Sequence, residues 1–103
     1  MVDLTYTFEA ELWLWEARSA SWCFVTLPVE AADEIKFFAR NRNGFGSLRV
    51  DVVIGQSKWQ TSIFPDKASN SFVLPIKKQV RKSENITAGD TASLSVRVRY
   101  DPE

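Results

Sequence analysis

Basic residues gather in one short segment of the chain, between Pro75 and Glu84. Lys77, Lys78 and Arg81 stand there at intervals that place them on one face of a helix, because residues three and four positions apart are neighbours on a helix surface. Several cations on one face can bind a phosphate or a carboxylate group. A solvated helix face without a ligand has the same pattern. The segment is therefore a candidate site for a small anionic ligand, with the solvated face as the alternative.

Three of the four tryptophans, Trp13, Trp15 and Trp22, lie near the start of the chain, and the fourth is Trp59. Buried aromatic side chains supply a large apolar area to a small core, and we assign Trp22 and Trp59 to the core. Trp13 and Trp15 fall on the otherwise polar face of their strand. Either they pack, in the core or in the interface of a homodimer, or they form a platform for a planar ligand.

The residues most often used in catalysis are scarce. The sequence has no histidine and one cysteine, Cys23. Histidine is the commonest general base and metal ligand, so its absence argues against catalytic triads and against most zinc and non-haem iron sites. Glu9 and Glu11 lie two positions apart and could form an acid pair, although solvating residues on an exposed strand face have the same spacing. We expect no catalytic residue, no metal and no cofactor.

Charge and hydropathy limit the partners. Thirteen basic and thirteen acidic residues give a formal net charge of zero, which argues against general nucleic-acid binding without excluding a local basic patch. No apolar stretch approaches the roughly 18 residues that a membrane span needs. The opening residues do not have the pattern of a secretion signal, and a single cysteine cannot form an internal disulfide. We expect a cytoplasmic protein without a membrane segment.

The length and the alternation of side chains predict one mainly β domain over residues 1–103. Six segments have the pattern of strands: 6–15, 22–27, 47–55, 58–64, 71–74 and 91–100. The first two are expected to form a hairpin with Trp15 opposite Trp22 and Trp13 opposite Phe24, which places Leu14 and Cys23 on the other face.

Two segments have helical spacing. Residues 28–41 begin with Pro28 and carry apolar side chains three and four positions apart. Residues 76–84 follow Pro75, with Ile76 and Val80 expected to face the core and Asn85 to end the helix in a left-handed conformation. Together with the strands, these segments predict a small, closed, six-stranded antiparallel β-barrel with two short helices over its openings.

Three stretches carry a resemblance to a known family. They are "SWCFVTLP", "GFGSLRVDVVIGQSKWQTSIFP" and "FVLPIKKQVRKSENITAGDTASLSVRV". In this order they resemble the bacterial family catalogued only as domain of unknown function nineteen-oh-five, over nearly the whole chain from Phe8 to Val98. The resemblance implies a small closed β-barrel whose last helix, Gly-Asp turn and final strand are similar to the swapped-hairpin (double-split) barrels of AbrB-type transcription factors. The family has no agreed activity, so it implies no catalytic residues.

Three hypotheses about function follow. The first is a non-enzymatic binding or interaction module that takes a small anionic ligand, a planar ligand or a protein partner. Its candidate ligand-binding residues are Trp13, Trp15, Lys77, Lys78 and Arg81. The second, which the likeness to AbrB-type proteins implies, is a nucleic-acid-binding regulatory domain. The third is an enzyme that works with carboxylates alone.

Overall fold

One antiparallel sheet of seven strands and two helices make up the described part of the chain, which in this computed structural model comprises residues 3–17, 20–39 and 46–99. The elements in chain order are β1 (Thr5–Glu11), β2 (Trp13–Ala17), β3 (Ala20–Thr26), α1 (Val29–Ala39), β4 (Leu48–Ile54), β5 (Ser57–Asp66), β6 (Ser71–Pro75), α2 (Lys78–Glu84) and β7 (Thr91–Arg99). In the sheet the strands are ordered β1-β7-β4-β5-β6-β3-β2. The mainly β prediction is confirmed.

The neighbouring strands β4 and β7 show why the sheet curls around a core. Successive side chains of a strand point to opposite faces, and in both strands every second residue is apolar. Val50 pairs with Val98 and Val52 with Val96, and all four side chains are buried. The same concave face carries the other buried residues of these two strands, Leu48, Ile54, Ala92 and Leu94. The curl therefore follows from removing one apolar face from water.

The prediction of a closed six-stranded barrel is wrong: the sheet has seven strands and forms a half-barrel. The first predicted strand is two strands, because the chain leaves the ladder at Leu12. The Leu12 N–H donates to the Asp90 carbonyl at 2.9 Å, and its own carbonyl accepts from the Gly89 N–H at 2.8 Å. Before this residue β1 pairs with β7, and after it β2 pairs with β3.

The sheet opens between β5 and β6. Phe64–Asp66 of β5 pair with β6, whereas Ser57–Ile63 pair with β4 alone among the described strands. The strand β6 has five residues, remains paired with β3 as far as Pro75, and then leads into α2. A strand this short cannot fill the space between two longer neighbours, so the sheet is split beyond Pro75.

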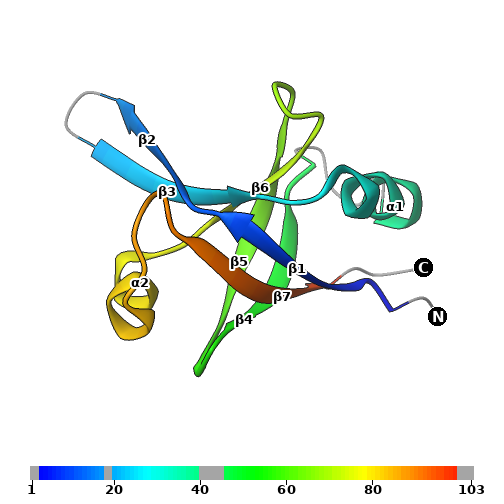
Figure 1. The fold of residues 1–103 in the computed structure, drawn as a ribbon. Helices are drawn as coiled ribbons and strands as arrows, with labels where there is room; N and C mark the ends of the chain where they lie inside the picture. Colours follow the sequence, from blue (N-terminus) through cyan, green and yellow to red (C-terminus); the bar gives the residue numbers. More distant parts are fainter. Residues whose placement is uncertain (1–2, 18–19, 40–45, 100–103) are drawn as a thin grey trace.

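The two helices lie at opposite ends of the curled sheet (Figure 1). In α1 the predicted apolar positions are buried (Ala31, Ala32, Ile35 and Ala39), and Phe38 packs against the core. In α2, Val80 is buried and Asn85 ends the helix with φ 57°, as predicted. Neither described helix is long and apolar enough to cross a membrane.

The turn after α2 agrees with the family resemblance. The Asp90 N–H donates to the Thr87 carbonyl at 3.0 Å, while the Asp90 carboxylate accepts from the Thr87 N–H at 2.9 Å. The helix, the Gly-Asp turn and β7 therefore follow one another as the resemblance implies. The sheet that contains β7, however, is open and not a closed barrel. The predicted ends of the first helix, at residues 40–41, and of the last strand, at residue 100, lie outside the described residues.

Candidate functional site

A groove of about 490 Å³ lies where β5 and β6 separate. This volume is within the range of about 300–1,000 Å³ that small-ligand sites occupy. Three segments of the chain form the walls of the groove, namely β3, β5 and the junction between β6 and α2. The lining residues are Ser21, Trp22, Cys23, Trp59, Gln60, Thr61, Pro75, Ile76, Lys77, Lys78 and Arg81.

The groove runs along strand edges. Trp59, Gln60 and Thr61 are consecutive in β5 and all line it, as do three consecutive residues of β3. Since neighbouring side chains in a strand point to opposite faces, three in a row can meet one groove only at the edge of the sheet. The backbone of β5 is therefore part of the groove wall.

Arg81 is fixed in place beside the groove. Its Nε donates to the Ile76 carbonyl at 3.0 Å, and the Ile76 N–H donates to the Cys23 carbonyl at 2.8 Å. These two bonds connect the half-buried guanidinium to β3 and leave its two Nη groups for other acceptors. Lys77 and Lys78, both exposed, stand on the same wall.

In the described part of the chain, no acidic side chain is paired with these cations. Among the described residues that line the groove, none is Asp or Glu, and the ion pairs found between described residues, Arg97 with Asp3 and Arg99 with Asp51, lie elsewhere. Positive charges along a concave, partly apolar wall raise the local concentration of anions. The arrangement can therefore hold a phosphate or a carboxylate.

The positive surface continues past the groove. A second hollow of about 300 Å³ is lined by Lys78, Arg81, Lys82, Asn85, Ile86 and Thr87. Lys78 and Arg81 belong to both hollows. The C-terminal end of α2 is held by Ser57, whose Oγ donates to the Glu84 carboxylate at 2.6 Å. This bond sets the helix, and with it the cations, against the start of β5.

The single cysteine lines the groove next to Arg81. Burial raises the pKa of the Cys23 thiol above its ordinary value, and the positive charge of Arg81 partly offsets that shift by lowering the pKa. The thiol is therefore protonated at neutral pH, and it forms part of the apolar floor beneath the cations.

The aromatic walls are Trp22 and Trp59. Trp59 is half-buried and packs against the core, close to what its assignment to the core predicts. The assignment of Trp22 to the core is wrong, because its side chain is 51% exposed. The predicted register is confirmed, with Trp15 opposite Trp22 and Trp13 opposite Phe24. The hairpin, however, extends beyond the core, which leaves both faces of its outer half in contact with solvent.

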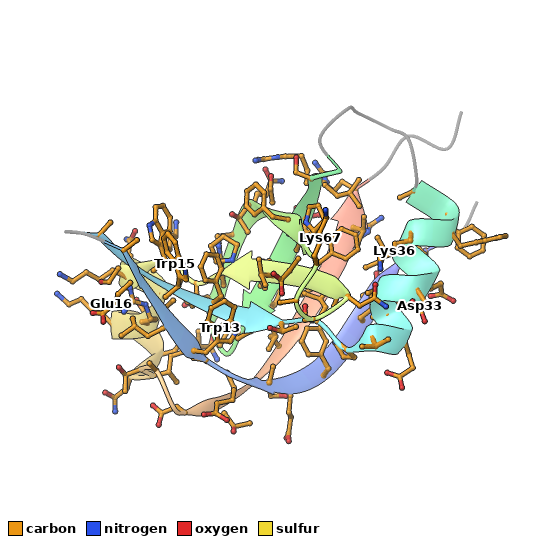
Figure 2. All side chains as sticks on the ribbon, turned by 90° about the horizontal axis from the view of Figure 1, so that it is seen from above. Trp13, Trp15, Glu16, Asp33, Lys36 and Lys67 are labelled. Carbon is orange, nitrogen blue, oxygen red and sulfur yellow. The ribbon has the colours of Figure 1, made fainter. Side chains whose placement is uncertain are left out.

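Trp13 and Trp15, which the sequence assigned either to packing or to a ligand platform, lie outside the groove as the structure describes it. Trp13 is half-buried: its Nε1 donates to the Thr26 hydroxyl at 2.9 Å, and its ring centroid lies 5.1 Å from that of Phe24. Trp15 is 46% exposed and lies farther out on the hairpin (Figure 2). Of the five candidate residues, the structure thus brings Lys77, Lys78 and Arg81 together.

A non-local signal connects the aromatic and basic residues. Phe24 pairs with Pro75, and the same antiparallel register carried two residues further brings Lys77 level with Trp22. Sequence patterns within single segments could not reveal this, because it depends on which distant strand pairs with β3. The sequence did carry one indication of this proximity: Lys77 stands two residues after Pro75, a proline that ends a strand.

The candidate acid pair lies on a different surface. Glu9 and Glu11 are exposed on the outer face of β1, opposite Ser93 and Thr91. Within residues 3–17, 20–39 and 46–99, no three potential metal-ligating side chains of the His, Cys, Asp and Glu types come together. Among its described lining residues, the groove therefore contains no paired carboxylates.

Fold and groove together define a class: a small, mainly β domain with a curled antiparallel sheet and a groove at its split edge. The family model described as domain of unknown function (DUF1905) matches residues 8–96. The chain therefore belongs to the DUF1905 family, as the three sequence stretches indicated. Among curated proteins, no sequence matches the chain.

Proposed function

We propose that this domain is a binding module whose groove holds an anionic group against the rings of Trp22 and Trp59. The observation that carries the proposal is the composition of the groove, in which two tryptophans face three cations without an acidic neighbour among the described lining residues. A charged hydrogen bond from a positioned guanidinium is among the stronger polar contacts in proteins. A flat apolar group can pack on the tryptophans at the same time.

A titration of the intrinsic tryptophan fluorescence tests this proposal. The probes are 1-naphthyl phosphate, which has both features, and inorganic phosphate and 1-naphthol, which have one each. We expect 1-naphthyl phosphate to bind more tightly than either part, by about tenfold or more, because each feature adds at least about 1.4 kcal/mol. Equal affinity for all three, or no binding of the combined probe, would overturn the proposal.

Substitutions then locate the bound probe. Arg81→Gln and Trp59→Leu should each weaken the binding of 1-naphthyl phosphate about tenfold, since each removes one of the two contacts. The matched controls are Lys67→Gln, an exposed cation in the turn between β5 and β6, and Trp15→Leu, a tryptophan on the hairpin; neither residue lines the groove. Both controls should bind the probe as the wild type does.

The outer half of the β2–β3 hairpin supports a second role, association with another copy of the chain. Leu14 and Trp15 are 49% and 46% exposed, and β2 is the last strand in the sheet order. An edge strand with exposed apolar side chains readily pairs with another strand. The self-association that the sequence suggested for Trp13 and Trp15 is therefore assigned to Leu14 and Trp15, and the oligomeric state in solution tests it.

A further inference from the structure

The free edge of β5 adds a feature that a site for a simple anion does not need. A two-residue turn joins β4 to β5, and Ile54 pairs with Ser57 across it. In such a turn the closing pair is hydrogen-bonded, and hydrogen-bonded pairs alternate with unbonded ones along the ladder. Trp59 and Thr61 therefore bond to β4. Gln60, which lies between them, directs its backbone N–H and C=O away from β4.

These two backbone groups of Gln60 face the groove. The ladder between β5 and β6 begins only at Phe64, and among the described residues no strand pairs with Gln60 on this side. Gln60 itself lines the groove. An unpaired strand edge is a template for an incoming strand, which supplies the missing hydrogen bonds. The exposed length, from Trp59 to Thr61, is about 10 Å of strand.

The opposite wall indicates the chemistry of such a strand. Lys77, Lys78 and Arg81 stand there without an acidic partner among the described residues. Lys82 extends the positive charge into the adjoining hollow. Since several separate cations line the path, a segment with more than one carboxylate complements them better than a single anion does.

We infer that the groove binds a short, extended, acidic peptide segment, which pairs with the edge of β5 at Gln60 and places carboxylates against Lys77, Lys78 and Arg81. This inference rests on the proposed function and names its ligand class. The peptide lies beside β5 in the space beyond Pro75, where β6 ends and no longer pairs with β5. Its apolar side chains, which share one face of an alternating segment, pack against Trp59.

The first test uses the unmodified protein and calorimetric titration. The ligand is an acetylated and amidated peptide of alternating Glu and Val, five residues long, and the comparison peptide has Lys in place of Glu. We expect the acidic peptide to bind about tenfold or more tightly than the basic one. A third peptide keeps the Glu-Val sequence but carries an N-methyl group on every backbone amide, which removes the donors of both strand edges and leaves the charges. Equal binding of the N-methylated peptide would overturn the inference.

A pair of variants tests the same hydrogen bond from the protein side. Proline is tolerated on a strand edge where its missing N–H faces outward, so Gln60→Pro removes the donor and Gln60→Ala keeps it. Gln60→Pro should weaken the binding of the acidic peptide about tenfold, while Gln60→Ala should bind this peptide as the wild type does. Circular dichroism and thermal unfolding check that both variants are folded.

Further arms of the experiment separate this inference from the proposed function. Gln60→Pro should weaken the binding of 1-naphthyl phosphate much less than that of the acidic peptide, because 1-naphthyl phosphate needs no strand edge. If 1-naphthyl phosphate binds and the acidic peptide does not, the groove is an anion site and the peptide inference fails alone. If a five-nucleotide oligothymidylate binds more tightly than the acidic peptide, the groove belongs to a nucleic acid and the inference is overturned.

Discussion

At the scale of single residues, Leu12 and Leu14 show how position within the same stretch decides what a side chain does. Leu12 is fully buried at the bend between β1 and β2. Leu14, two positions later on the same predicted face, is 49% exposed. The concave face of the sheet ends between them. Their identical chemistry makes them a matched pair for measuring what the bend contributes to stability.

We expect Leu12→Ala to lower the free energy of unfolding by about 2–5 kcal/mol, because it leaves a cavity in the core. Leu14→Ala should change it by no more than about 0.5 kcal/mol, as is usual for exposed positions. Urea denaturation of the two variants measures both values. A Leu14→Ala loss as large as that of Leu12→Ala would mean that the hairpin is packed against something.

Cys23 gives a prediction about pH. Burial raises the pKa of its thiol in the folded protein. The contribution to stability is therefore fully present below the unfolded-state pKa of about 8.5, and it is lost as the pH rises through the folded-state value. Between about pH 7 and about pH 10, the free energy of unfolding of the wild type should fall more than that of Cys23→Ala. Parallel curves for the two proteins would contradict the shift.

At the scale of elements, the split between β5 and β6 determines what the site can do. The strand β5 has ten residues and β6 has five, and seven residues of β5, Ser57–Ile63, pair with β4 alone among the described strands. Had β6 continued for three more residues, its backbone would fill the groove. Instead, Pro75 is followed by α2, which brings cations to the place where the ladder stops.

Amide hydrogen exchange checks this arrangement without any ligand. The amides of Trp59 and Thr61 are bonded to β4 and should exchange slowly, while the amide of Gln60 between them should exchange rapidly. Residue-resolved exchange followed by NMR gives the three rates. Strong protection at Gln60 in the free protein would mean that the edge is already occupied.

At the scale of the whole molecule, the exposed hairpin determines whether the domain acts alone. Light scattering at increasing protein concentration should show a dimer, since β2 offers a free edge and exposed apolar side chains. A variant with Leu14→Ser and Trp15→Ser together should remain a monomer at the same concentrations. Trp13 is kept in that variant, because its hydrogen bond to Thr26 contributes to the fold. A wild-type monomer throughout would exclude this second role.

Local patterns were sufficient for part of this picture. The pairing of Trp15 with Trp22, the burial of Val80 and the left-handed Asn85 all depend on neighbours in sequence, and all were predicted. The break at Leu12 was missed because it depends on contacts with Gly89 and Asp90, far along the chain. The groove was missed for the same reason: its walls come from segments that sequence patterns treat separately.

The pairing of β1 with β7 has a consequence for how the protein is made. Thr5 pairs with Arg97, so the first described strand is completed by the last. During synthesis on the ribosome, β1 remains unpaired, with its apolar side chains exposed, until the residues of β7 have left the exit tunnel. Contacts between such distant residues form slowly. Chaperones that shield nascent chains would therefore meet this small domain for nearly the whole time of its translation.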